Sequence, residues 1–577
     1  MNDSSPTAAQ RFQDHPARLR QEEAATKACN QGRMFIQQQR YQEAMTCLLQ
    51  AMELHPSLAA AYEGMAQIFT YKGLTVLGSV YERLFQHYAG QPAPLAQVEH
   101  TFFIDPALAR RTAHLGQRII LHKAYSVPQL CYTLGKPLPE DLPTVIALLP
   151  DQTGRFLATT RLHFPRRVEF DPQRTEQVQM AVHTAKTIES AMQQRIAWIE
   201  DARQRCLNEA PVFDEHGPLR IFMPTSRSTT VMQFATNNLA RALLKLGCQV
   251  RVHIEQDDRE WDDDYSRLQD YEACKPHVII NINHLFNDWL HPDVINVTWW
   301  QDPMLEISRG DPLPWRSRDL VYSAYPNFDD YLKKTGATQV MRQDLCVDLD
   351  VFHPEIPWEE RRKVVFIGTS YAELLPSQLP EKQTIIDLLR PRFLRGEMIS
   401  FATLDDYSRK TGLNTLAIES IYCDLLRNTA IEWLCQMAHE IDLEVEIYGR
   451  YWERNEHVRP FYKGELRHGP DVAAVYNQAR YALAVHPFMV KSQRLAEIAA
   501  CGCVPVLMDD RANAEPPHWD DAILFFRTRD ELKSCLRQRP PQDSRIIAEA
   551  CSYDRFARHI LNRVTSILKQ PVAESTS

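Results

Sequence analysis

The chain has 577 residues, of which 44% are hydrophobic and 24% are charged, and its formal net charge is −9. This balance is typical of globular proteins and excludes a mostly disordered or fibrous chain, and the length predicts about three or four domains. The negative charge excludes a global basic field for nucleic acid. There is no apolar run of about 18 residues and no apolar signal segment, so we expect neither a membrane span nor secretion. The 13 cysteines contain no CxxC pair, which favours reduced thiols in a cytoplasmic protein without a zinc site.

The N-terminal part of the sequence is dominated by helical spacing. Residues 1–23 are polar and predict a disordered or loosely helical lead-in. Residues 24–95 predict two pairs of helices, and the first pair resembles a 34-residue tetratricopeptide repeat. The positions that carry this resemblance are Gly32, Phe35, Tyr41, Ala44, Leu48, Ala51 and Pro56. These repeats would serve either as a helical cap or as a surface that grips a protein. We interpret residues 96–215 as a mostly helical connecting region that completes their packing.

From Pro218 onward, short β-rich runs alternate with helical stretches, in one series over 218–350 and a second over 355–565. Such alternation predicts parallel, doubly wound sheets that are buried on both faces. We therefore predict an α/β fold with two Rossmann-like domains in tandem, preceded by the helical repeat domain. Residues 370–440 predict a helical insertion in the second domain, and residues 566–577 a disordered tail. Ligands of such sheets bind at the carboxyl ends of the strands, here in the cleft between the domains.

The segment 476–510 carries the most chemical information. A strand is followed by a polar loop, then by a helix that begins after Ser492 and carries Arg494 and Glu497 in its first turns. A helix N-terminus favours anions, and an arginine there can form paired hydrogen bonds with a diphosphate. A carboxylate beside it can accept two hydrogen bonds from a ribose diol. The pattern thus suits a nucleoside diphosphate, and the alternative is an ordinary i,i+3 ion pair on the surface of a crossover helix.

Two motifs together resemble the GT-B glycosyltransferases. The segment CVDLDVFHP (346–354) is similar to their interdomain linker, and the helix motif is similar to the donor motif of the group 1 enzymes. Ser492, Arg494, Glu497, Ala500, Gly502 and Pro505 occupy the matching places. The closest resemblance is to the CgeB-like, spore-maturation-type branch, which also shows a strand ending in glycine and a Trp-x-Asp-x-Pro-like element, as at residues 366–368 and 300–303. Met489 departs from the pattern, because many group 1 enzymes have a glutamate at that place, so the stereochemical outcome stays open.

The resemblance, which covers residues 218–565, directs attention to further strand ends. Gly368 and Thr369 end one predicted strand, and their amides are candidates for approach to a phosphate, with a simple tight turn as the alternative. Gly449 and Arg450 end another, where Arg450 is either a cation for the leaving diphosphate or a solvated loop side chain. Lys463, in a segment that resembles the frame of the nucleobase, is a weaker phosphate candidate.

Two further side chains are candidates for the chemistry itself. Asp302 follows a predicted strand of the first series and is a candidate general base near the acceptor hydroxyl, or else a loop cap before a proline. His486 follows a strand of the second series and is a candidate for stabilising the leaving group, or else a satisfied core histidine. The neighbouring Trp299 and Trp300 are candidates for stacking on a sugar, although core packing fits them better.

The resemblance implies transfer of a glycosyl group from a nucleoside diphosphate sugar to an acceptor hydroxyl, without a metal and with the donor sugar in place of a cofactor. By analogy, the repeats suggest a protein acceptor or partner. Two alternatives stay open: a non-catalytic scaffold with a degenerate GT-B module, and a nucleotide-sugar epimerase on the same fold.

Overall fold

The structure is a computed structural model that describes the chain in the following segments: 8–92, 100–116, 130–136, 138, 144–214, 216–227, 230–256, 259–260, 264–302, 304–371, 382–413, 415–486, 490–511 and 519–569. The chain divides into two compact units. The first comprises Met1–Glu209, Ser226–Thr230 and His253–Ala273, and the second Ala210–Thr225, Val231–Val252 and Cys274–Ser577. Within the described segments, no helix combines the length and the apolar character that crossing a membrane requires.

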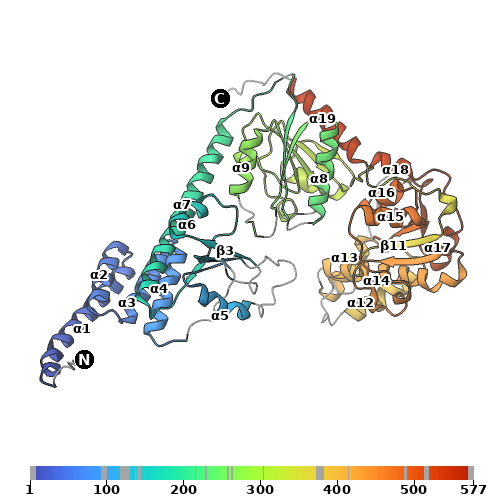
Figure 1. The fold of residues 1–577 in the computed structure, drawn as a ribbon. Coiled ribbons are helices and arrows are strands. Elements are labelled where there is room, and N and C mark those ends of the chain that lie inside the picture. Colours follow the sequence, from blue (N-terminus) through green and yellow to red (C-terminus); the bar gives the residue numbers. More distant parts are fainter. Residues whose placement is uncertain are drawn as a thin grey trace. The chain divides into compact units, whose positions relative to one another are not determined.

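The first unit begins with four helices, drawn in blue in Figure 1: α1 (Ala8–Gln37), α2 (Tyr41–Leu54), α3 (Ala59–Tyr71) and α4 (Thr75–Tyr88). A Cβ atom at Gly32 would lie 2.8 Å from Cγ of Leu48, so α1 and α2 approach closely because this position lacks a side chain. Leu48 is fully buried. The predicted pairing of helices is therefore present, and the lead-in that the sequence leaves disordered or loosely helical is helical from Ala8 onward.

A four-stranded parallel sheet follows in the same unit. Its strands are β1 (Thr101–Phe103), β2 (Cys131–Leu134), β3 (Val145–Leu148) and β4 (Arg167–Glu169), in the order β3-β2-β1-β4. Its helices are α5 (Pro106–Gly116), α6 (Pro150–Thr159) and α7 (Thr175–Asn208). The prediction of a mostly helical connecting region misses this sheet. Strands of three or four residues are too short to show a period, and β1 and β2 are buried throughout.

The second unit contains the sheet predicted over 218–350. It has the order β10-β9-β8-β7-β5-β6, built from β5 (Arg220–Pro224), β6 (Gln249–His253), β7 (Val278–Ile282), β8 (Ile295–Trp300), β9 (Leu320–Ser323) and β10 (Val340–Arg342). The chain between these strands forms α8 (Thr230–Lys245), α10 (Leu305–Ser308) and α11 (Pro326–Lys334). It also forms α9 (Asp264–Cys274), which belongs to the first unit except for its last residue. Trp299 and Trp300 are fully buried in β8, so the core reading of this pair is correct.

The C-terminal helix α19 (Tyr553–Leu568) packs on this six-stranded sheet, which is called the first sheet below, while the five-stranded sheet is called the second. The ring of Phe556 lies 4.9 Å from that of Trp299 and 5.0 Å from that of Tyr322, centroid to centroid. The sequence assigns this stretch to the second domain, because helical periodicity does not reveal which sheet an apolar face covers. The second domain's own fold therefore ends before α19.

The second sheet has the order β12-β11-β13-β14-β15, from β11 (Lys363–Ile367), β12 (Glu444–Tyr448), β13 (Ala479–Ala484), β14 (Val504–Met508) and β15 (Leu524–Phe526), with parallel pairing throughout. Along β11, Val364 and Phe366 join the core beneath α12 (Lys382–Leu394), α13 (Phe401–Thr411) and α14 (Thr415–Gln436). Val365 and Ile367 face the opposite core, with α15 (Pro470–Gln478), α16 (Gln493–Ala500) and α18 (Arg545–Ala550). Figure 1 shows these two helical layers on either side of β11.

The two sheets confirm the predicted fold class, an α/β protein with two Rossmann-like domains preceded by helices. The remaining helix, α17 (Arg529–Cys535), packs beside β15. In each of these two sheets, the strand that comes first in the sequence lies between the next two strands of the sequence: β5 lies between β6 and β7, and β11 between β12 and β13. The strand order therefore reverses at β5 and at β11. In the second sheet the reversal falls between β11 and β13, and open α/β sheets place their ligands at the carboxyl ends of such a pair.

Two glycines meet beside this reversal. Gly449, after β12, has a φ of +122°, and a Cβ atom there would lie 2.2 Å from the carbonyl oxygen of Gly368 after β11. Only a residue without a side chain allows the two strand ends to approach this closely.

We expect Gly449→Ala to lower the free energy of unfolding by several kcal/mol, because it adds an overlap with backbone to an unfavourable φ. Gly464→Ala is the matched control, since Gly464 has a φ of +101° with no atom within 4 Å of the added Cβ. This control carries the conformational cost alone, about 1–2 kcal/mol. Urea denaturation measures both, and equal losses would refute the proposed close approach.

Candidate functional site

The site is built at the carboxyl edge of the second sheet, where its strand order reverses. Gly368 and Thr369 follow β11, and Val485 and His486 follow β13. β11 and β13 are hydrogen-bonded neighbours, so their ends lie side by side. The structure thus brings together four of the residues that the sequence singles out: Gly368, Thr369, His486, and Gly449, whose backbone meets that of Gly368.

Arg427, from the middle of α14, connects these two strand ends. Its Nη1 donates to the Thr369 carbonyl at 2.9 Å, and its Nε and Nη2 donate to the Val485 carbonyl at 3.2 and 3.0 Å. The guanidinium also lies 3.7 Å from the ring centroid of Tyr371, and Arg427 is only 3% exposed. Sequence reasoning missed it, although an arginine within an otherwise apolar stretch of helix is itself a signal of an internal partner.

Arg427 also controls the charge of His486. Its Nη2 lies 3.1 Å from Nδ1 of His486. Burial, together with the positive charges of Arg427 and Arg494, lowers the pKa of His486 to about 3. His486 is therefore neutral at neutral pH, so it could assist a leaving group only by donating a hydrogen bond and not as a cation.

The first turn of α16 holds the predicted donor motif. The Ser492 hydroxyl accepts from the backbone N–H of Leu495 at 3.2 Å and so caps the helix. Arg494 Nη1 and Glu497 Oε2 lie 2.9 Å apart, and the two side chains are 26% and 2% exposed. The pair is thus an i,i+3 ion pair, but it is turned into the protein and does not lie on the surface.

Glu497 accepts from two further side chains. Nε2 of His468 lies 2.8 Å from Oε1 of Glu497, and Nε2 of Gln493 lies 3.0 Å from the same oxygen. Burial acts to raise the pKa of Glu497, but Arg494, His468 and Gln493 outweigh it and hold the pKa below its ordinary value. The carboxylate is therefore ionised and already well supplied with donors. A ribose diol would need the remaining acceptor capacity or would displace one of them.

His468 is the second residue that sequence reasoning missed. It precedes α15 and stands 29 positions before Glu497. Its ring also packs against Phe234 of α8, at 4.5 Å between centroids, and against Phe352 of the predicted linker, at 6.0 Å. No local pattern relates these positions, because the contact is made only by the tertiary fold.

The side chains of two predicted phosphate cations, Arg450 and Lys463, form ion pairs with carboxylates of this domain. The side chain of Arg450 is 65% exposed and pairs with Glu465 at 3.0 Å, although the Arg450 carbonyl accepts from the Ser370 amide at 3.0 Å. Nζ of Lys463 lies 4.0 Å from Glu444, the first residue of β12, and so at the amino end of the sheet. Each side chain pairs with a carboxylate that the tertiary fold brings near it, and the sequence does not reveal these partners.

Asp302 stands at the carboxyl end of β8 in the first sheet. Its Oδ2 accepts from Nδ2 of Asn283 at 2.8 Å, and Asn283 Oδ1 accepts from the Asp302 backbone N–H at 3.1 Å. Asp302 is exposed, so its carboxylate is open to a ligand while Asn283 fixes its orientation. Its role as a general base stays a prediction. Met489 lies outside the described residues.

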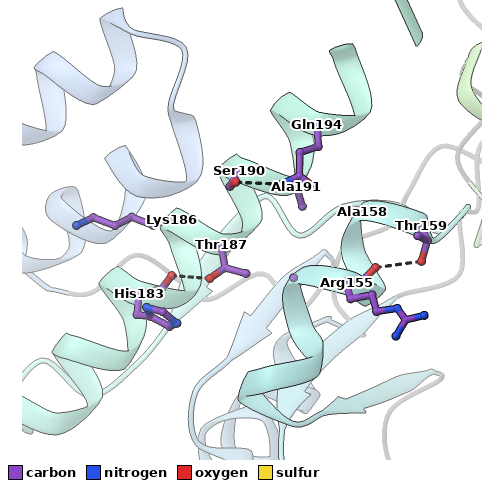
Figure 2. A pocket seen from close by; sticks show the side chains of 10 residues that line it. Arg155, Ala158, Thr159, His183, Lys186, Thr187, Ser190, Ala191 and Gln194 are labelled. Atoms are coloured by element: carbon purple, nitrogen blue, oxygen red, sulfur yellow. Dashed lines mark hydrogen bonds between the residues drawn. The ribbon is translucent and has the colours of Figure 1, made fainter. Parts of the chain in front are cut away.

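A separate hollow of about 480 Å³ lies in the first unit between α6 and α7 (Figure 2). A Cβ atom at Gly154 would lie 3.2 Å from Cγ2 of Thr187, so the two helices nearly touch beneath it. Arg155, His183 and Lys186 are exposed along its rim. The sequence gives no sign of this groove, and it is distinct from the edge described above.

Comparison with known proteins finds a family match that covers most of the second sheet. Residues 427–569 match a protein-family model described as glycosyl transferase-like. The chain therefore carries a glycosyltransferase-like domain in its C-terminal part, and the match includes Arg427, His486, Arg494 and Glu497. No curated protein matches the chain.

Several solved structures are similar at low identity. A sucrose-phosphate synthase from Thermosynechococcus elongatus is 10% identical with a TM-score of 0.36, over 61% of this chain and 99% of that chain. A glycosyltransferase from Rickettsia africae ESF-5 is 10% identical with a TM-score of 0.39, over 62% and 100%. A mutant O-GlcNAc transferase from Thermobaculum terrenum is 10% identical with a TM-score of 0.27, over 96% and 95%. The fold assignment itself rests on the strand orders of the two sheets.

We expect Glu497→Ala to lower the free energy of unfolding by about 3 kcal/mol, because it leaves the Arg494 guanidinium largely buried without its carboxylate. Glu465→Ala is the control, since it breaks the exposed pair with Arg450 and should cost under about 1 kcal/mol. Chemical denaturation followed by circular dichroism measures both. A loss for Glu497→Ala as small as that of the control would show that the network contributes no stability.

Proposed function

We propose that the protein is a glycosyltransferase that takes a sugar from a nucleoside diphosphate donor, which it binds at the carboxyl edge of β11 and β13. The observation that carries this proposal is the placement of two guanidinium groups beside His486 at that edge. Arg427 Nη2 lies 3.1 Å from Nδ1 of His486, and Arg494 on α16 acts with Arg427 to lower the pKa of His486. Such a place favours an anion, and the matched glycosyltransferase-like domain contains all three residues.

The polar groups at this edge suit a diphosphate. The first turn of α16 offers backbone amides and the positive end of the helix dipole, and Arg494 leaves a quarter of its side chain accessible. Gly368 and Thr369 contribute backbone at the end of the neighbouring strand. Glu497 would hold Arg494 in place and accept from the ribose, and Ser492 would fix the start of the helix.

The reaction would break the bond between the anomeric carbon and the diphosphate oxygen and form a bond from that carbon to the acceptor oxygen. Negative charge then develops on the diphosphate while the sugar becomes oxocarbenium-like. We propose that Arg494, the helix amides and neutral His486 stabilise this charge without a metal. Asp302 is the proposed base for the acceptor hydroxyl, whose proton must leave as the new bond forms.

We further propose a protein as the acceptor. This step is an analogy, supported by the paired helices α1 to α4, whose grooved face is lined by Tyr41, Tyr71 and small residues such as Ala66 and Gly78. The rings of Tyr41 and Tyr71 stack with 6.0 Å between their centroids, and Tyr71 is 70% exposed.

The test begins with a panel of UDP-, GDP-, CMP- and dTDP-sugars in a thermal-shift assay, since a ligand of the folded state raises its melting temperature. We expect one nucleotide class to stabilise the chain, and nucleoside diphosphate to be released only when an acceptor is added. Binding without turnover would favour a scaffold. An altered sugar released without acceptor would favour an epimerase. No shift with any donor would refute the proposal.

We expect Arg494→Ala to weaken binding of the selected nucleotide by about 10- to 100-fold, the usual effect of losing a hydrogen bond to a charged group. Arg467→Ala is the matched control, because Arg467 is an 89% exposed arginine of the same domain. It should leave the affinity within about twofold, since an exposed charge is screened. Calorimetry measures both, after denaturation has shown that each variant folds. Equal effects would place the diphosphate elsewhere.

A further inference from the structure

The contact between Arg427 and His486 determines which ring nitrogen of His486 carries the proton, as well as the charge of the ring. A guanidinium has N–H donors and no acceptor, so the 3.1 Å contact requires His486 Nδ1 to accept. A histidine can accept at Nδ1 only as the neutral imidazole that carries its proton on Nε2. The geometry therefore selects one of the two neutral tautomers.

We propose that Arg427 is a positioning residue that locks His486 in the Nε2–H tautomer, so that Nε2–H is the hydrogen-bond donor to the diphosphate of the sugar donor. The lock acts on the free protein, whereas the destination of the Nε2–H bond rests on the proposed function. Among the described residues, none accepts a hydrogen bond from Nε2. This nitrogen is therefore available at the edge where Gly368 and Thr369 end β11.

The lock is rigid because Arg427 is held in position by groups other than His486. Three of its four bonds go to the carbonyl oxygens of Thr369 and Val485, which belong to the two strand ends themselves. The ring of Tyr371 covers the guanidinium plane at 3.7 Å. The two carbonyls cannot titrate, so the position of the guanidinium does not change with pH.

The charged groups that act on His486 oppose its protonation. Arg427 approaches from α14 and Arg494 from α16, and both lower its pKa along with burial. Glu497, the carboxylate of this network, is bound to Arg494. An unperturbed histidine would become a cation near pH 6.5 and lose its fixed role, whereas His486 keeps the same donor between about pH 5 and 8.

The first test is nitrogen-15 NMR of the full chain with labelled histidine and no ligand. The His486 signal is assigned by its loss in His486→Gln. His277 serves as an internal reference, because its Nδ1 accepts from the Arg220 amide at 3.0 Å and its Nε2 lies 2.8 Å from the Val212 carbonyl. We expect His486 to show the Nε2–H tautomer from pH 5 to 8. A proton on Nδ1, or a titration within this range, would overturn the lock.

The second test removes Arg427. In Arg427→Met we expect the titration midpoint of His486 to rise by at least about one pH unit toward 6.5. Arg361→Met is the matched control, because Arg361 is also buried in this domain and donates to the carbonyls of Ile356, Ala479 and Cys501 but to no histidine. It should lower stability without moving the midpoint. An unmoved midpoint in Arg427→Met overturns the assignment. Should that variant not fold, Arg427→Gln, which also removes the positive charge, provides the same comparison.

The third test concerns the destination of the Nε2–H bond. A glutamine amide can place its N–H near the position of Nε2, and an asparagine amide near that of Nδ1. We expect His486→Gln to retain affinity for UDP or GDP within about threefold and His486→Asn to lose about tenfold or more. Equal losses would overturn donation from Nε2. If the wild-type chain binds no nucleotide, the proposed function fails and this role with it, while the spectrum alone decides the lock.

Discussion

The second domain depends on one buried cation. Arg427 lies inside α14, and its hydrogen bonds hold the carboxyl ends of β11 and β13 together at the point where the strand order reverses. An arginine that is 3% exposed is costly unless its donors are satisfied, so the strand-end carbonyls and this side chain require each other. The same contact therefore supports the two strand ends at which we propose that the donor binds.

This constraint explains the electrostatics of the site. Arg427 and Arg494 surround His486 with positive charge, and Glu497 compensates only Arg494. Arg427 has carbonyl dipoles and an aromatic face as partners, and no carboxylate among the described residues pairs with it. Arg427 therefore keeps a positive charge that no described carboxylate compensates, beside a histidine whose pKa is lowered.

The buried pair on α16 shows why a motif and its environment must be considered together. Arg494 and Glu497 form the i,i+3 contact that their spacing allows on any helix. Burial of Glu497 and the contact from His468 convert this ordinary pair into part of a network. Lys463 and Arg450 show the converse, because their positions in the sequence are suggestive but nearby carboxylates draw their side chains elsewhere.

The sequence by itself determined the local features. Short β-rich runs predicted the strand series of the two large sheets, and helical spacing predicted the helix that begins after Ser492. The glycines at the strand ends were also visible, because each of these features depends on neighbours in the chain. Only the tertiary structure decided the rest. The contacts of Arg427 with Thr369 and Val485 span 58 positions, the short sheet β1 to β4 has no readable period, and α19 packs on a sheet formed some 250 positions earlier. Such contacts arise from packing, which no local pattern encodes.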